Sequence, residues 1–284
     1  MTIVCGTDFS ACADAAAGAA AALARRLELP LILVHVTAQR ASDPGYEEVS
    51  ARLRAETEAL QARFDLEIEA VLEPGVAHER LAALAVGRNA RMIVVASLGE
   101  QKPRRWLLGS VAERVAQSSP VPTLVVRDGA ILEAWARGER SLRVMVGVQL
   151  SPTARAALEW ANGLREVGAC ELHVVQIAWP AVEHRRAGGT APMPLDRLRP
   201  ELEQVLQREL EQWVGEHPGI GPTSCLVKPG FGRVDSHLIL LARELGMDLL
   251  VVGTNQRAGI SRLWQGSVSR GVLQAATMNV ACVP

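Results

Sequence analysis

A pattern of strand, loop and helix that occurs twice constrains the fold of this chain more than any other feature. In the first copy, the apolar run 92–95 (Met-Ile-Val-Val) precedes a polar loop that contains Gly99 and ends at Gly109-Ser110. The second copy has the run 249–252 (Leu-Leu-Val-Val) and then Gly266-Ser267, which follows the first Gly-Ser pair by 266 − 109 = 157 positions. Because repetition at a fixed period indicates a duplicated structural unit, we expect two domains of the same kind.

The bulk composition agrees with two globular domains. At 284 residues the chain is near the length at which a single core stops growing, and two domains of about 140 residues each are the natural expectation. A net charge of −1 gives no electrostatic reason to expect binding to nucleic acid or to a membrane surface. The five cysteines are scattered without a Cys-x-x-Cys pair, which argues against a disulfide framework or a zinc site.

No segment is predicted to direct the chain into a membrane. The Ala-rich stretch 11–27 lacks the basic leader of a signal peptide, and Asp14 interrupts it. No apolar run reaches the roughly 20 residues that a membrane-spanning helix needs. A soluble, cytoplasmic protein is therefore expected.

Strands and helices are predicted to alternate in both halves. In the first half, strands are expected at 2–6, 31–36, 66–72, 92–96 and 123–126, and helices at 10–27, 46–64, 77–89 and 110–117. In the second half, strands are expected at 142–148, 171–178, 224–228, 249–252 and 280–283, and helices at 152–167, 195–216, 234–245 and 267–275. Such alternation implies right-handed crossovers and a parallel sheet.

The predicted fold class is therefore α/β, with two doubly wound parallel-sheet domains in tandem. The first domain is expected at residues 1–128 and the second at 142–284, joined by a linker at 129–141 that is partly helical in composition. The segment 179–194 is rich in Pro, Gly and Arg and is interpreted as a mobile loop.

Three parts of the first half are expected to meet at one ligand site. In a doubly wound sheet, ligands bind outside the carboxyl ends of the strands, where the strand order reverses. Asp8 follows the first strand and suits hydrogen bonds to a nucleoside, whereas Val36 ends the second strand and suits packing against a base. Free N–H groups around Gly99, Gly109 and Ser110, together with the positive end of a helix dipole, suit a phosphate.

Specific motifs accompany this layout. Residues 7–10 read Thr-Asp-Phe-Ser, residues 35–36 read His-Val, and the glycine loop reads Ala96-x2-Gly99-x9-Gly109-Ser110. In these motifs the chain resembles the universal stress protein family in its tandem two-domain form, over nearly its whole length. The family's ATP-binding signature is Gly, two residues, Gly, nine residues, then Gly-Ser or Gly-Thr. The resemblance implies Rossmann-like domains of the adenine nucleotide alpha hydrolase-like type.

The resemblance also implies the residues of the site. In the first domain the nucleotide-binding candidates are Thr7, Asp8, Val36, Ala96, Gly99, Gly109, Ser110 and Val111. In the second domain the matching candidates are Gln149, Ile177, Gly253, Gly266, Ser267 and Val268. The implied ligand is ATP, and whether Mg²⁺ accompanies it is left open.

Each half departs from the family pattern. Ala96 replaces the first glycine of the signature, and a methyl group there is costly if the position needs a positive φ. Glu100 follows Gly99 and would repel a phosphate. In the second half Gln256 replaces the other glycine and Gln149 replaces the aspartate, so the first site is the better preserved.

Three functions stay open at this stage. The leading one is a stress-response regulatory protein that binds ATP or a related adenine nucleotide, mainly in its first domain. The alternatives are a protein-interaction module with degenerate pockets and a weak ATP hydrolase. No Walker A lysine, nucleophile elbow or HExxH motif is present, so no catalytic or metal-binding residue is assigned. Structural explanations also remain, because Asp8 is suited to capping a helix and Gly109 to close packing of a helix on the sheet.

The resemblance implies how the two halves pair. In the family, the fifth strand commonly lies at an edge and pairs antiparallel with its counterpart. Strand 123–126 is therefore expected to meet strand 280–283 within the chain, which would cover an apolar edge. A further homodimer is left open.

Overall fold

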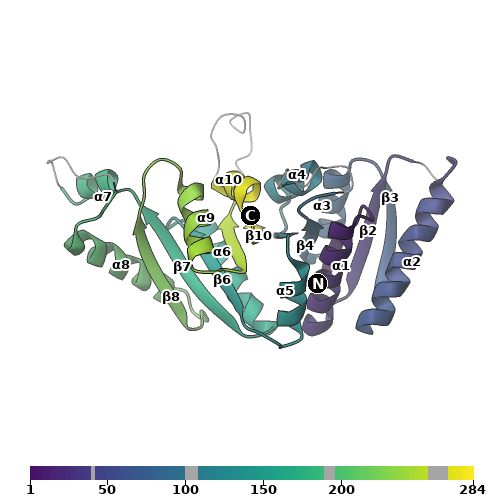
Figure 1. Ribbon diagram of the computed structural model, residues 1–284, viewed down its shortest axis with the longest axis horizontal. Helices are drawn as coiled ribbons and strands as arrows, with labels where there is room; N and C mark the ends of the chain where they lie inside the picture. The colour runs from purple at the N-terminus through teal and green to yellow at the C-terminus, as the bar shows by residue number, and fades with distance from the viewer. Residues whose placement is uncertain (40–41, 100–107, 189–195, 255–267) are drawn as a thin grey trace.

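The computed structural model describes residues 1–39, 42–99, 108–188, 196–254 and 268–284 (Figure 1). Its centre is one ten-stranded sheet in the order β3-β2-β1-β4-β5-β10-β9-β6-β7-β8. The strands are β1 (Thr2–Gly6), β2 (Leu31–Thr37), β3 (Ile68–Pro74), β4 (Ala90–Ala96), β5 (Thr123–Val126), β6 (Leu142–Val148), β7 (Cys170–Ala178), β8 (Thr223–Pro229), β9 (Leu249–Gly253) and β10 (Asn279–Val283).

The strand order shows a duplicated, doubly wound architecture. Neighbouring strands are parallel except for β5 and β10, which run antiparallel with Val125 opposite Val280. Each half has the same order outward from this joint, so the fifth, fourth, first, second and third strands of each half follow in turn. The predicted fold class, two doubly wound α/β domains in tandem, is confirmed.

Helices cover both faces of the sheet. They are α1 (Ala11–Leu27), α2 (Tyr46–Phe64), α3 (Ala77–Gly87), α4 (Ser110–Ser118), α5 (Gly129–Ala136), α6 (Pro152–Gly163), α7 (Pro180–Arg186), α8 (Pro200–Gly215), α9 (Val234–Glu244) and α10 (Val268–Ala275). One apolar layer lies under α1, α2, α5, α6 and α8, and the other lies under α3, α4, α9 and α10. Both layers contain residues of both halves, so the core continues across the β5–β10 joint.

The alanine content of α1 explains how this helix is covered on several sides. Ser10 caps its start, because the hydroxyl accepts a hydrogen bond from the Ala13 amide at 3.1 Å. The small side chains then allow close approach of the sheet on one side and of α5 on another. At Gly129 in α5, an added Cβ would overlap the Ala15 carbonyl, so these two helices touch at their backbones.

The segment 129–141 does more than connect the two halves. Its helix α5 packs on α1, and Trp135 is only 1% exposed. The indole Nε1 of Trp135 donates a hydrogen bond to the Ala169 carbonyl at 3.0 Å, which fixes α5 to the second half. Figure 1 shows α5 near the middle of the molecule, close to the boundary between the halves.

Two details of the predicted elements were wrong. The segment 179–194 was expected to be a loop, but Pro180–Arg186 forms α7, with a proline in the first turn where its missing N–H is harmless. Residues 189–194 of that segment lie outside the described residues. The following helix was expected from 195 and starts instead at Pro200, again with proline in its first turn. Among the described residues, no helix combines the length and the apolar composition that crossing a bilayer requires.

A buried asparagine fastens the two halves together. Asn279, at the start of β10, is 0% exposed. Its Oδ1 accepts hydrogen bonds from the amides of Arg127 (2.8 Å) and Asp128 (3.0 Å). Its Nδ2 donates to the carbonyls of Asp128 (3.1 Å) and Asp248 (3.3 Å). One side chain therefore satisfies four backbone groups from both sides of the joint.

Replacing this side chain should be costly. We expect Asn279→Ala to lower the free energy of unfolding by roughly 2–4 kcal/mol, because several buried polar groups lose their partners at about 1–3 kcal/mol each. Chemical denaturation measures this difference. The matched variant Thr277→Ala removes a hydroxyl that accepts a hydrogen bond from the exposed Arg243 side chain, and it should change stability by less than about 0.5 kcal/mol. Equal effects of the two variants would contradict the role of Asn279.

Candidate functional site

The strand order locates the point at which a ligand site is expected. From β1 the chain proceeds outward to β2 and β3, and it then crosses to β4 and β5 on the other side of β1. The order therefore reverses between β1 and β4, and the carboxyl ends of these two strands form the switch point. Thr7 and Asp8 follow β1, Ala96 ends β4, and α4 begins nearby at Ser110. The fold thus assigns these segments to one edge of the sheet.

Asp8 and Gly99 are in contact at this edge. A Cβ on Gly99 would overlap the Asp8 carboxylate, so the absence of a side chain at Gly99 makes room for Asp8. The other carboxylate oxygen of Asp8 accepts hydrogen bonds from the Ser10 amide (3.2 Å) and hydroxyl (2.6 Å). Asp8 therefore has a structural role in this turn, and one of its oxygens lies against the glycine loop.

Gly109 stands directly before α4. Its amide donates a hydrogen bond to the Ser97 carbonyl at 2.6 Å, so the expectation that this N–H is free was wrong. No side chain caps α4, which leaves the first-turn amides of Ser110 and Val111 without a side-chain partner in the described part of the chain. Gly109 has a φ of −81°, a value that any residue adopts.

Against the described residues, an added Cβ at Gly109 would make only ordinary contacts. It would lie 3.4 Å from the Ser97 carbonyl oxygen and 3.8 Å from the Gly99 amide nitrogen. These described neighbours therefore do not require glycine at Gly109. The Cβ would nevertheless lie near the Gly99 amide, beside the start of α4.

The substitution of Ala96 for glycine brings no backbone strain. Among the described residues other than glycine, positive φ values occur at Phe9, Glu28, Asp65 and Asn89, and Ala96 is not one of them. Ala96 is partly buried and packs against the apolar layer under α1. Val36 lies near the end of β2 and packs on the opposite layer, under α3 and α4. Val36 and α4 thus share one face of the sheet.

The turn that carries Asp8 has an unusual conformation. Phe9 has a φ of +64°, which is rare for an aromatic residue. Its amide donates to the Thr7 hydroxyl at 3.0 Å, and its ring stacks on His35 with ring centres 4.4 Å apart. The Arg52 guanidinium lies over the same ring, 4.6 Å from its centre, and donates to the Phe9 carbonyl at 3.2 Å. Neighbouring side chains therefore hold this turn from two elements, β2 and α2.

Glu56 of α2 completes the contacts on this turn. Its carboxylate accepts a hydrogen bond from the Thr7 hydroxyl at 3.0 Å. Burial raises the pKa of the Glu56 carboxyl above its ordinary value, although the bond from Thr7 acts in the opposite direction. Neither Arg52 nor Glu56 could be predicted from the sequence, because the spacing along α2 indicates only which face is apolar. Nothing local shows that α2 reaches the β1–α1 turn.

The corresponding edge of the second half is arranged differently. Gly253 ends β9, and a Cβ there would lie 2.7 Å from the Thr153 carbonyl oxygen at the start of α6. The protein's own backbone therefore explains this glycine. Gln149 is exposed after β6, and Ile177 is buried in β7 at 7% exposure.

The remaining second-domain candidates surround the start of α10. Val268 is the first residue of this helix. Gly266 and Ser267 lie outside the described residues, as does Gln256. Among the described residues, no group of three or more His, Cys, Asp or Glu side chains is arranged to hold a metal ion.

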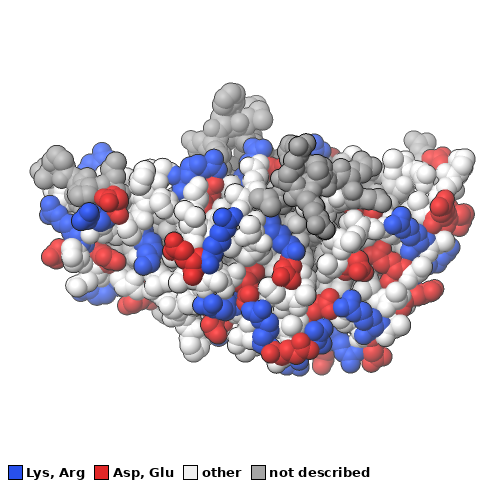
Figure 2. All heavy atoms as spheres, viewed as in Figure 1, with Lys and Arg blue, Asp and Glu red and all other residues white. Residues whose placement is uncertain are grey.

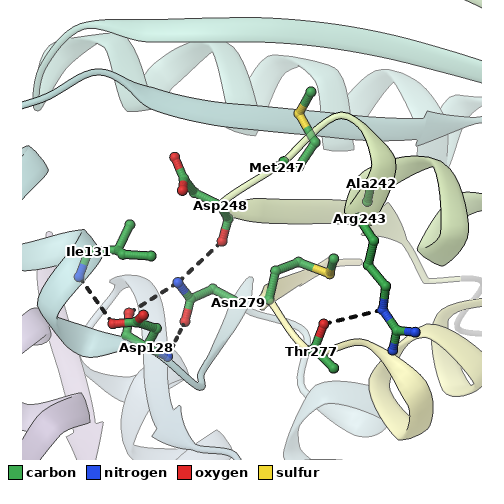
Figure 3. Close-up of a pocket in the computed structure, with 10 residues that line it drawn as sticks. Asp128, Ile131, Ala242, Arg243, Met247, Asp248, Thr277 and Asn279 are labelled. Atoms are coloured by element: carbon green, nitrogen blue, oxygen red, sulfur yellow. Dashed lines mark hydrogen bonds between the residues drawn. The ribbon is translucent and has the colours of Figure 1, made fainter.

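A cleft of about 300 Å³ lies elsewhere, at the seam between the halves (Figure 3). Met247 and Met278 line it together with Asp128 and Asp248. Asn279 also lines it and donates the hydrogen bonds described above to the carbonyls of Asp128 and Asp248. None of the residues predicted for nucleotide binding lines this cleft. On the face drawn in Figure 2, acidic and basic side chains are interspersed, so neither sign of charge dominates that face.

Comparison with known proteins identifies the family. The model of the universal stress protein family matches residues 1–127 and again residues 141–284. Universal stress protein Rv2005c of Mycobacterium tuberculosis is 26% identical over an alignment of 295 residues, gaps included. The alignment covers 98% of this chain and 95% of that protein. Universal stress protein Rv2623 of the same organism is 24% identical over 299 residues, covering 97% and 94%. The chain therefore belongs to the universal stress protein family.

Solved structures agree on the fold. A universal stress protein from Archaeoglobus fulgidus superimposes with a TM-score of 0.69 at 16% identity, covering 99% of this chain and 97% of that one. Some members of the family bind adenine nucleotides. One universal stress protein was solved in complex with cAMP (27% identity, TM-score 0.39, 45% of this chain and 97% of that one). One from A. fulgidus was solved with dAMP (23% identity, TM-score 0.36, 43% and 94%).

The raised pKa of Glu56 gives a testable dependence on pH. Because the folded state binds this proton more tightly than the unfolded state, the contribution of Glu56 is most favourable below its ordinary pKa of about 4.3. That contribution is lost as the pH rises through the folded-state pKa. Glu56→Gln keeps an acceptor for Thr7 and removes the half-buried charge. We expect the melting temperature of this variant, relative to the wild type, to increase between about pH 4 and about pH 7.

The control for this measurement is Glu58→Gln, which neutralises an exposed carboxylate on the same helix. Its melting temperature relative to the wild type should vary less with pH. A difference for Glu56→Gln that is constant across the range would contradict burial of the charge.

Proposed function

We propose that this protein is a stress-response regulatory protein whose first domain binds ATP or a related adenine nucleotide. The proposal rests on the surroundings of Gly109 at the start of α4. Two explanations are open for it, close packing of α4 on the sheet or approach of a ligand. Packing against the described residues does not require this glycine, because a Cβ meets only ordinary contacts there and the φ is unremarkable. This geometry supports access for a ligand at the helix start.

The electrostatics at this point favour a phosphate. Helix α4 starts without a side-chain cap, so the amides of its first turn and the positive end of its dipole face the switch point. A phosphate there would accept hydrogen bonds from Ser110 and Val111 and from the Ser110 hydroxyl, which is exposed. The bond from Gly109 to Ser97 joins the start of α4 to the end of β4 and removes one donor from the set.

The nucleoside would extend from the phosphate toward β1 and β2. Asp8 lies in the turn after β1, and its carboxylate is suited to a ribose hydroxyl or a base N–H. Val36 lies on the same face as α4 and offers an apolar surface to the base. Family membership supports this assignment at a general level, because universal stress proteins have been solved in complex with cAMP and with dAMP.

The second domain is assigned a lesser role in binding. The start of α6 lies against Gly253 so closely that a methyl group would not fit, whereas Ala96 in the first domain carries one. Gln149 also lacks the charge of Asp8. We therefore propose one nucleotide for each chain, in the first domain.

One observation favours the alternative of an interaction module without a nucleotide. The Asp8 carboxylate and the bonded Gly109 amide fill part of the space at the switch point with the protein's own groups. If these groups close the site, nucleotide binding is lost while the fold is retained. A direct measurement of nucleotide binding to the purified protein separates the two functions.

The first test is to identify ligands that purified protein releases on denaturation, by mass spectrometry, and to titrate nucleotide-free protein with ATP by calorimetry. We expect an adenine nucleotide in the first measurement and saturable binding in the second. Gly109→Ala should weaken ATP binding at least about tenfold, a loss of about 1.4 kcal/mol, because its methyl group enters the space assigned to the phosphate.

The matched control is Gly87→Ala at the end of α3, where an added Cβ meets no atom within 4 Å. It should bind ATP as the wild type does. Both variants should fold, so a loss confined to Gly109→Ala is attributable to the site. Wild-type protein that neither releases nor binds a nucleotide would instead support the interaction module.

A further inference from the structure

Helices α4 and α10 occupy equivalent positions in the two repeats. They contact each other across the seam between the halves (Figure 1). The contact is centred on one carboxylate. Glu113 Oε1 accepts hydrogen bonds from Arg270 Nε at 3.0 Å and from Gln274 Nε2 at 3.1 Å. Gln117, one turn further along α4, also donates to this oxygen at 3.4 Å. The Glu113 side chain is 26% exposed, so this ion pair is partly shielded from solvent.

The residues in this contact occupy equivalent positions in the two repeats. The separation 270 − 113 = 157 equals that between Gly266 and Gly109, and 274 − 117 = 157 as well. The glutamine is the same in both repeats, but the partner of Glu113 is an arginine. Two glutamates at these positions would place like charges together. The duplicated units have therefore diverged into a complementary pair at this point.

Glu113 lies close to the site proposed for a phosphate. It is in the first turn of α4, three residues after Ser110, so both residues lie on the same side of the helix. Helical side chains lean toward the amino terminus of their helix, and a helix start attracts a carboxylate. Without other partners, the Glu113 carboxylate would move toward the first-turn amides and would repel a phosphate there. Arg270 and Gln274 instead hold it toward α10.

We infer that Arg270 of the second domain is a positioning residue for the nucleotide site of the first domain. It neutralises Glu113 and keeps this carboxylate away from the start of α4. The second domain, in which the Thr153 carbonyl lies against Gly253, thus supports binding in the first. This inference rests on the proposed function, and it adds a role for the contact between the repeats.

The experiment is a double-mutant cycle on the full chain, with ATP and adenosine titrated separately at low ionic strength. Arg270→Ala should weaken ATP binding about two- to fivefold, the range that the strength of partly exposed ion pairs converts to. Adenosine lacks phosphates, so its affinity should not change. Glu113→Gln should bind ATP at least as tightly as the wild type, and Arg270→Ala should have no further effect when Glu113→Gln is present.

The control for the loss of a paired arginine is Arg155→Ala, which breaks an exposed ion pair with Glu159 on α6. It should leave both affinities unchanged. Equal weakening by Arg270→Ala in both backgrounds would show that Arg270 acts on the phosphate without Glu113, and this would overturn the inference. So would an unchanged ATP affinity, or a parallel loss for adenosine, which would indicate a general structural defect. Wild-type protein that binds neither ligand would refute the proposed function itself.

Discussion

The antiparallel pairing of β5 with β10 is the interaction on which the rest of the structure depends. It joins two parallel sheets into one, so neither half leaves this strand as an exposed edge. Asn279 secures the joint because its buried amide group bonds to backbone on both sides of it. The apolar layers on both faces then continue from one half into the other, with α5 packed near the seam. The two repeats therefore form one structural unit.

This arrangement brings equivalent positions of the repeats together and makes their differences visible. Position 113 is acidic and position 270 is basic, and the two meet. Ala96 carries a methyl group at the end of β4, whereas Gly253 cannot accommodate one beside Thr153. The repeats thus share a backbone plan, but their two edges differ at these equivalent positions. The apolar pattern of the strands and helices is enough to retain the fold of a duplicated unit. The geometry at the edge of each sheet depends instead on individual side chains.

The motif glycines illustrate how far sequence reasoning reaches toward a site. The signature treats Gly99 and Gly109 alike, but their physical explanations differ. Gly99 makes room for the Asp8 carboxylate, whereas the described neighbours of Gly109 include no contact that demands glycine. The sequence likewise could not indicate that the Gly109 amide bonds to Ser97 or that Arg52 and Glu56 hold the turn after β1. These contacts arise only when segments distant in the chain are packed together.

The sequence by itself determined the strand and helix alternation, the duplication and the parallel, doubly wound fold class, because apolar periodicity and turn residues are local properties. It misread Pro180–Arg186, since a proline at a helix start and a proline in a loop look alike without neighbours. The tertiary structure decided that α5 is part of the core and which glycines the fold requires. It also decided that Glu113 meets Arg270. Contacts between distant segments depend on how completed elements pack, and local patterns record only which of their faces are apolar.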